Sequence, residues 1–196
     1  MYRIFAMCLE ACVAAVLLVP IFLIMNRFYF HDLGRTVGYL IFSVYLAAVD
    51  AVVGLPDISY IRLSFNYNFV PFLYMFSDYK NSLLNVLLFV PLGFFLPFFW
   101  KKFRSFGYTV LFGFCTSLFI ELLQIFTFRA TDVNDLITNT LGAALGYLLA
   151  RVLLKFLPKH TPSEQTGDVF IVFGISFGVM FLFQPFLAKL VWNLVL

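Results

Sequence analysis

The chain has 196 residues, of which 63% are hydrophobic, 20% are aromatic and only 12% are charged, and its mean hydropathy is +0.98. Soluble domains carry roughly 25% charged residues, so this composition excludes an ordinary soluble protein and predicts a polytopic membrane protein. The net charge of +3 is not gathered into a basic block, and we therefore expect no nucleic-acid partner.

Six apolar segments follow one another along the chain, each close to the ~20 residues that a membrane-spanning helix needs. They cover residues 4–25, 36–54, 82–99, 107–126, 134–156 and 169–190. The sequence therefore predicts an all-α bundle of about six transmembrane helices, in a single membrane domain over residues 1–196. Pro185 is expected to bend or end the main part of the last helix, because proline lacks a backbone N–H.

The positions of lysine and arginine predict the orientation of these helices. With the N-terminus outside, eight of the thirteen basic residues fall in cytoplasmic loops and five fall on the outer side. Cytoplasmic loops of membrane proteins are enriched in Lys and Arg, so both termini are predicted to be extracytoplasmic.

The link between the second and third helices, from Pro56 to Lys80, is unusually aromatic. Between Ile61 and Phe69, apolar residues alternate with polar ones, which favours an extended segment on an apolar surface. Its aromatic side chains suit the headgroup level of a bilayer. The sequence leaves two interpretations open: a lid that only covers the bundle, or one wall of a site for a lipid headgroup.

Most of the unusual polarity lies between Glu121 and Asn139, where one apolar run ends and the next begins. A carboxylate such as Glu121 inside a membrane helix costs about 2 kcal/mol or more unless it is paired, protonated or wetted, and intramembrane acids are often functional. An ion pair with Arg129 is the structural alternative.

Asp132, Asp135 and Asn139 are spaced so that they share one face of a helix. The same residues can be interpreted as a helix start, with Asp132 or Thr131 as the cap and an acid in the first turn. That interpretation does not explain Asn139, which lies one turn deeper. Asn85, one turn inside the third helix, also needs a polar partner in a dry setting.

Two glycine pairs have the GxxxG spacing, Gly142 with Gly146 and Gly174 with Gly178. This spacing lets helix backbones approach closely. We expect both pairs to pack helices within the chain, with homo-oligomerisation through these faces as the alternative.

Together these residues resemble the VanZ-like family of bacterial membrane proteins. The resemblance covers about residues 60–150, including NFVPF from Asn68 and NVLLFVPLGF from Asn85, and leaves residues 1–35 and 168–196 as flanking helices. Its most specific part is the run Glu121-x2-Gln124-x4-Arg129-x2-Asp132-x2-Asp135-x3-Asn139-x2-Gly142-x3-Gly146. The resemblance implies a place in the bacterial cytoplasmic membrane and a role at the cell envelope, where one member of the family is associated with low-level resistance to the glycopeptide teicoplanin.

Two functions remain open at this stage. In the first, an outward polar pocket binds a membrane lipid headgroup, a lipid-linked wall precursor or a lipoglycopeptide. Its candidate ligand-binding residues are Asn68, Asn85, Glu121, Gln124, Arg129, Asp132, Asp135 and Asn139.

The second function is an intramembrane enzyme acting on a lipid-linked substrate. Glu121 would be the general base, Asp132 and Asp135 would orient it or hold a divalent cation, and Arg129 would stabilise an oxyanion. The oxygen ligands of Asp132, Asp135 and Glu121 suit Mg²⁺ or Ca²⁺, but Arg129 among them would repel a cation, so we assign no metal site and no cofactor.

Overall fold

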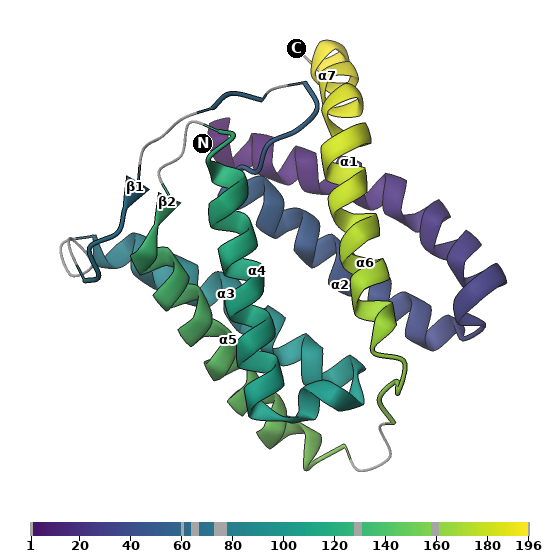
Figure 1. Ribbon diagram of the computed structural model, residues 1–196. Helices are drawn as coiled ribbons and strands as arrows, with labels where there is room; N and C mark the ends of the chain where they lie inside the picture. The colour runs from purple at the N-terminus through teal and green to yellow at the C-terminus, as the bar shows by residue number, and fades with distance from the viewer. Residues whose placement is uncertain are drawn as a thin grey trace. The chain divides into compact units, whose positions relative to one another are not determined.

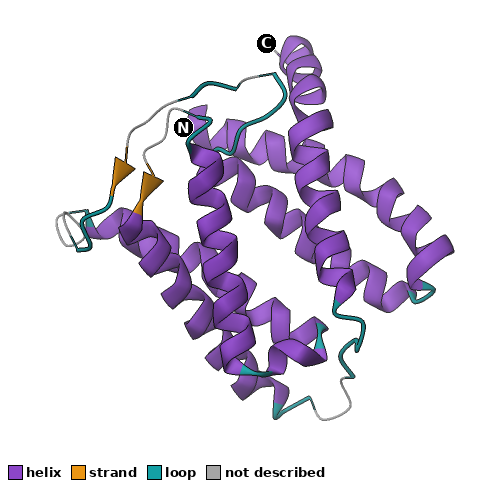
Figure 2. Cartoon of the chain, viewed as in Figure 1, coloured by secondary structure: helices purple, strands orange, loops and turns teal. Residues whose placement is uncertain are grey.

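The structure is a computed structural model that describes residues 2–59, 61–63, 67–72, 78–127, 131–157 and 161–195. Over these ranges it contains six helices long and apolar enough to cross a membrane, joined by loops and one pair of two-residue strands (Figures 1 and 2). The predicted all-α transmembrane fold is confirmed, and the protein is a multi-pass membrane protein. The chain divides into two compact units, residues 1–61 with 167–196, and residues 62–166.

The unit of residues 62–166 holds three long helices, whose ends lie within three residues of the predicted ones. These are α3 (Tyr79–Phe99), α4 (Phe106–Gln124) and α5 (Val133–Leu154). A short 3-10 helix, η2 (Lys101–Arg104), lies between α3 and α4. The strands β1 (Tyr67–Asn68) and β2 (Thr131–Asp132) precede α3 and α5.

Three glycines bring α3 and α5 into backbone contact. A β-carbon on Gly142 or Gly146 of α5 would collide with the carbonyl oxygen of Val86 or Val90 of α3. A β-carbon on Gly93 of α3 would likewise collide with α5. Gly142 meets Val86, and four residues later on both helices Gly146 meets Val90, so α3 and α5 run parallel. The close packing predicted for Gly142 and Gly146 is therefore confirmed.

The other unit is built from α1 (Tyr2–Met25), α2 (Leu33–Val53), α6 (Gly167–Gly178) and α7 (Gln184–Val195), with π-helical turns at η1 (Asn26–Phe30) and η3 (Val179–Phe183). Helix α2 packs against α1 and α6, and α7 packs against α1. Among the described residues of this unit, nothing lies within 4 Å of a β-carbon placed on Gly174 or Gly178. The close packing expected of that pair is not found there.

Pro185 interrupts the last helix, as the sequence predicted. The α-helical hydrogen bonds stop at Gly178 and resume at Gln184, after the π-helical turn. Because proline has no N–H, the carbonyl of Phe181, four residues earlier, cannot receive its usual helical bond. That carbonyl instead accepts the backbone N–H of Ile58 at 3.1 Å. This hydrogen bond joins the loop that follows α2 to the last helix.

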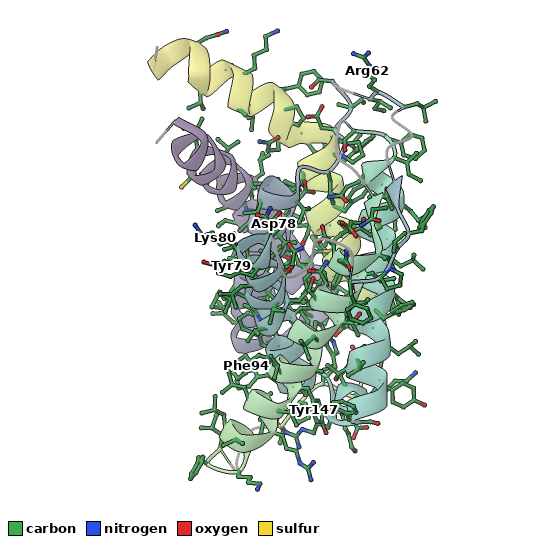
Figure 3. All side chains as sticks on the ribbon, turned by 90° about the vertical axis from the view of Figure 1, so that its left-hand side faces the viewer. Arg62, Asp78, Tyr79, Lys80, Phe94 and Tyr147 are labelled. Carbon is green, nitrogen blue, oxygen red and sulfur yellow. The ribbon has the colours of Figure 1, made fainter. Side chains whose placement is uncertain are left out.

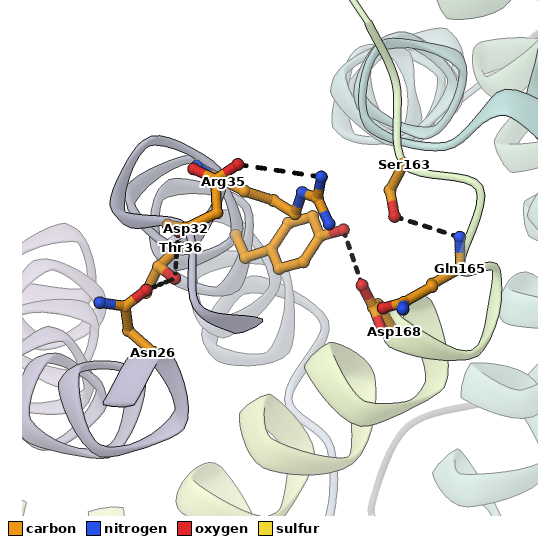
Figure 4. Close-up of polar contacts among 8 residues, drawn as sticks. Asn26, Asp32, Arg35, Thr36, Ser163, Gln165 and Asp168 are labelled. Atoms are coloured by element: carbon orange, nitrogen blue, oxygen red, sulfur yellow. Dashed lines mark hydrogen bonds and ion pairs between the residues drawn. The ribbon is translucent and has the colours of Figure 1, made fainter. Parts of the chain in front are cut away.

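Polar contacts hold α2 to its neighbours in this unit (Figure 4). Asp32 caps α2 by accepting the N–H of Arg35 at 3.0 Å. The Thr36 hydroxyl donates to Asn26 Oδ1 at 2.9 Å, and the Tyr39 hydroxyl donates to the buried Asp168 of α6 at 3.1 Å. Within a membrane the hydrophobic effect does not drive helices together, so van der Waals packing and hydrogen bonds such as these fix which faces meet.

Candidate functional site

The strands β1 and β2 join two loops that lie far apart in the sequence. They pair in parallel, with Tyr67 opposite Thr131 and Asn68 opposite Asp132, beside the first turn of α5 (Figure 1). The backbone N–H of Arg62 also bonds the carbonyl of Phe126 at 3.0 Å. The extended segment predicted between Ile61 and Phe69 is therefore strand at Tyr67–Asn68, while residues 64–66 lie outside the described residues.

Asp132 is the N-cap of α5. Its Oδ1 accepts the backbone N–H of Asn134 at 2.8 Å and the side-chain amide of Asn68 at 3.1 Å. The capping interpretation of Asp132 is thus confirmed. Asp132 itself has extended backbone angles and the helix begins at Val133, so the predicted three-residue helix face is wrong in one member. Only Asp135 and Asn139 lie on the helix.

Glu121, near the end of α4, is 4% exposed and points at the start of α5. Its Oε2 accepts the backbone N–H of Asp132 at 2.8 Å, and its carbonyl accepts the Thr131 hydroxyl at 3.1 Å. The buried carboxylate therefore satisfies a donor at the N-terminus of α5, where the helix dipole also favours negative charge. Arg129, its predicted ion-pair partner and a candidate site residue, lies outside the described residues.

Asn139 lies deeper and is 3% exposed. Its Nδ2 donates to the hydroxyl of Ser117 on α4 at 2.9 Å. Its Oδ1 is buried and accepts no hydrogen bond from the part of the chain that the structure describes. A buried acceptor without a donor costs about 1–3 kcal/mol, so this oxygen is a place where a ligand or water donor would be stabilising.

The remaining candidates lie around these groups. Gln124 is buried one turn beyond Glu121, and Asn68 and Asp135 are half-buried. Asn85 of α3 is also half-buried. Val86 of α3 lies beside Gly142 of α5. Counted from that pair along the two parallel helices, Asn85 lies about two residues, or roughly 3 Å along the axis, from the level of Asn139. The fold thus brings seven of the eight candidate ligand-binding residues to one end of the unit, which we call the polar end.

Comparison with known proteins identifies the family. The family model VanZ/LLP1 matches residues 36–155, which include α3, α4, α5 and both strands. A protein of Enterococcus faecium named Protein VanZ is 31% identical over 159 residues, covering 76% of this chain and 93% of the relative. The chain belongs to the VanZ/LLP1 family. No solved structure matches it.

Two polar residues inside the VanZ/LLP1 match were missed by the sequence analysis, Ser117 and Asn134. Ser117 is fully buried, and its hydroxyl oxygen accepts a hydrogen bond from the side-chain amide of Asn139. Asn134 is 5% exposed, and its Oδ1 accepts the backbone N–H of Phe72 at 2.7 Å. A signal for Ser117 was available, because Gly113, Ser117 and Glu121 recur every four residues and all face inward. Asn134 follows the cap by two residues, and nothing in its spacing pointed to Phe72.

The hydrogen bond to Asn134 anchors the aromatic loop of this VanZ-family chain. Phe72 has a left-handed backbone, with φ of 63°, and its ring is 60% exposed. Phe69 and Tyr79 are exposed to a similar degree, and Tyr79 lies beside Asp78 and Lys80 at the start of α3 (Figure 3). The loop therefore carries exposed aromatic rings next to the polar end. Tyr60, Phe65, Tyr74 and Phe76 lie outside the described residues.

Metal-binding potential can be judged for the residues that the structure describes. Among these, no three or more His, Cys, Asp or Glu side chains are grouped so that they could hold a metal ion. Two of the acids at the polar end are instead committed to backbone donors, Glu121 to Asp132 and Asp132 to Asn134.

Proposed function

We propose that this protein contributes to resistance against teicoplanin and related glycopeptides by binding the headgroup of an envelope lipid or of a lipid-anchored ligand at its polar end. Membership of the VanZ/LLP1 family supports the resistance role. The observation that carries the binding role is the buried Oδ1 of Asn139, an acceptor with no donor among the described residues. A hydroxyl or amine of a headgroup would supply that donor.

The polar end offers two layers to such a ligand. Half-buried Asn68, Asp132 and Asp135 form a rim, and buried Asn139 lies one turn below Asp135. The acids of the rim favour ligands with hydroxyl or ammonium donors, since hydrogen bonds to a charged acceptor are roughly twice as strong as neutral ones. The exposed rings of Phe69 and Phe72 would accompany the apolar tail at the level of the headgroups.

The enzyme alternative is less well supported. It requires Glu121 as a general base, within reach of a substrate proton. The Oε2 of Glu121 is 2.8 Å from the N–H of Asp132, and the carboxylate is almost fully buried. Because one oxygen of this carboxylate already holds the start of α5, taking up a substrate proton would weaken that bond, and binding without turnover is the function we favour.

We further propose that the polar end faces outward across the cytoplasmic membrane, with both termini on the same outer side. The uneven distribution of Lys and Arg supports this orientation. In a cysteine-free background, a cysteine at Thr131 should react with an impermeant thiol reagent added outside, and one at Ser105 should not. The reverse labelling would put the polar end in the cytoplasm.

The function is tested with Asn139→Ala and Asp135→Asn in a Gram-positive host challenged with teicoplanin. Asp135→Asn should fold and insert normally, because only a weak dipole contribution of about 0.3–1 kcal/mol is lost. Asn139→Ala loses the hydrogen bond to Ser117, which should cost about 1 kcal/mol and still leave the protein folded and inserted. Each should lose most of the resistance per unit of folded protein. Thr140→Ala is the matched control, since among the described residues the Thr140 hydroxyl bonds the carbonyl of Leu136 in its own helix, and it should keep the resistance.

Full resistance in both Asn139→Ala and Asp135→Asn, at normal membrane abundance, would contradict the proposed site. Abundance and folding are measured by surface labelling and by the size-exclusion profile in detergent. Release of a co-purified lipid from the wild type, but not from Asn139→Ala, would identify the ligand by mass spectrometry.

A further inference from the structure

In the unit of residues 62–166, the end opposite the polar end contains a cavity of about 480 Å³ that is open at the protein surface. It lies where α3 and α5 end and α4 begins, roughly 28 Å from the polar end along the 19 residues of α4. Figure 3 shows Tyr147 toward this end and Tyr79 toward the other. The cavity is lined by Pro97, Arg104, Tyr147, Arg151, Leu154 and Lys155.

The described charged residues that line this cavity are all basic. They are Arg104, Arg151 and Lys155, and no acidic side chain is among the described lining residues. Arg151 and Lys155 are one helical turn apart, so they present two cations on the same side of the helix end. Like charges held around one cavity repel each other, and an anion between them would relieve that repulsion.

The neighbouring basic residues are already engaged. Lys101 bonds Glu164 at 2.6 Å, and the ammonium group of Lys102 lies 5.0 Å from the centre of the Tyr108 ring. Within the described part of the chain, no ion pair involves Arg151 or Lys155. Glu164 and the Tyr108 ring are therefore committed to other cations, and among the described residues neither takes up Arg151 or Lys155.

The rim of the cavity is held in place by Tyr147. Its ring is 7% exposed, and its hydroxyl donates to the backbone carbonyl of Arg104 at 2.8 Å. The ring of Phe106 packs edge-on against it, with the centroids 5.4 Å apart. One helical residue before it, Gly146 contacts the backbone of α3. These contacts fix η2 against α5, so the cavity is formed before any ligand arrives.

We propose that this cavity binds the phosphate of an anionic ligand, as carried by the headgroup of a membrane glycerophospholipid. Arginine side chains match phosphate oxygens with two parallel N–H donors, and basic pockets between transmembrane helices suit anionic headgroups. Pro97 and Leu154 give the cavity apolar walls, which suit the start of an acyl chain better than a free ion. This site is independent of the function proposed for the polar end.

The test uses the full-length protein in detergent, titrated with phosphatidylglycerol or with phosphate-free diacylglycerol, and native mass spectrometry to count bound lipid. Phosphatidylglycerol should bind to the wild type and diacylglycerol should not. The double variant Arg151→Gln/Lys155→Gln should weaken phosphatidylglycerol binding about tenfold. The matched control Lys101→Gln/Lys102→Gln removes the same charge at the same end and should weaken it less than twofold.

Equal weakening by the two double variants would overturn the proposal, because it would mean a diffuse attraction to the basic surface. Should Arg151→Gln/Lys155→Gln fail to give a monodisperse protein, Arg151→Lys replaces it. That variant keeps the charge but loses the two-pronged donor, and it should bind phosphatidylglycerol several-fold less tightly. Unchanged binding in Arg151→Lys would then count against the site.

Excess inorganic phosphate distinguishes the source of the ligand. Phosphatidylglycerol that stays bound in excess phosphate would assign the cavity to a lipid headgroup. Displacement of phosphatidylglycerol by inorganic phosphate, if it depends on Arg151 and Lys155, would assign the cavity to free phosphate. That result would still support a phosphate site.

Discussion

The two ends of the unit formed by residues 62–166 differ in what their charged side chains contact. At the polar end, the carboxylates of Glu121 and Asp132 each accept a backbone N–H near the start of α5, and Glu121 is buried there. At the opposite end, which we call the cationic end, Arg151 and Lys155 line an open cavity whose described lining residues include no acid. A charge buried with its donors is a fixed part of the fold, whereas charges gathered around a space are available to something outside the chain.

The largest effect should come from breaking the contact that sets both ends in register. Gly146→Leu places a side chain where the carbonyl of Val90 lies, so α3 and α5 must separate, at a cost of about 3 kcal/mol or more. Thermal unfolding in detergent should show a large loss of stability, together with loss of both teicoplanin resistance and phosphatidylglycerol binding. Gly174→Leu in α6 is the control, because no described atom lies within 4 Å of its β-carbon. Equal stability of the two variants would contradict the packing.

A smaller effect separates the hydrogen bond of Glu121 from its charge. Glu121→Ala leaves the N–H of Asp132 without its acceptor and opens a small void, which should cost about 2–4 kcal/mol. Glu121→Gln keeps an oxygen for that N–H and should cost about 1 kcal/mol. Melting temperatures of the two variants in detergent measure the difference. A Gln variant as unstable as the Ala variant would instead mean that the negative charge itself is needed, as an ion pair with Arg129 would require.

Much of the fold could be predicted from the sequence because membrane helices have a strong signal. Runs of about twenty apolar residues located all six spans, and GxxxG spacing located the contact of Gly142 and Gly146 with α3. The same spacing misled at Gly174 and Gly178, since a glycine pair permits close packing but does not supply the partner helix.

The candidate site was predicted as a set of residues but not as a set of contacts. Intramembrane polarity drew attention to Glu121, Asp132 and Asn139, which the structure places at the same end of α4 and α5. The β1–β2 pairing was missed because two-residue strands have no periodicity, and their partners are 64 positions apart in the chain. Without that pairing, Asn68 could not be recognised as a partner of Asp132, nor could the start of α5 be placed one residue after it.

The smallest effect belongs to the cationic end and depends on pH. The ammonium group of Lys101, through a hydrogen bond and its charge, holds the pKa of Glu164 below its ordinary 4.5. A lowered pKa stabilises the folded state above pH 4.5, and that contribution is lost as the pH falls through the lowered value. The melting temperature of the wild type should therefore exceed that of Glu164→Gln slightly at neutral pH, and the two should converge in acid. Both side chains are well exposed, so the difference should be small. A difference that grows in acid would contradict the pairing.

The parallel packing of α3 on α5 also has a consequence for biosynthesis. These two helices are not neighbours in the chain, because α4 lies between them. During synthesis α3 and α4 are made before α5, so the surface of α3 around Val86 and Val90 at first lacks its glycine partners. The strand at Tyr67–Asn68 likewise lacks its partner until Thr131–Asp132 is made. The synthesis of β2 and α5 therefore completes the helix pair and anchors the aromatic loop, and a nascent chain stopped before Thr131 has neither.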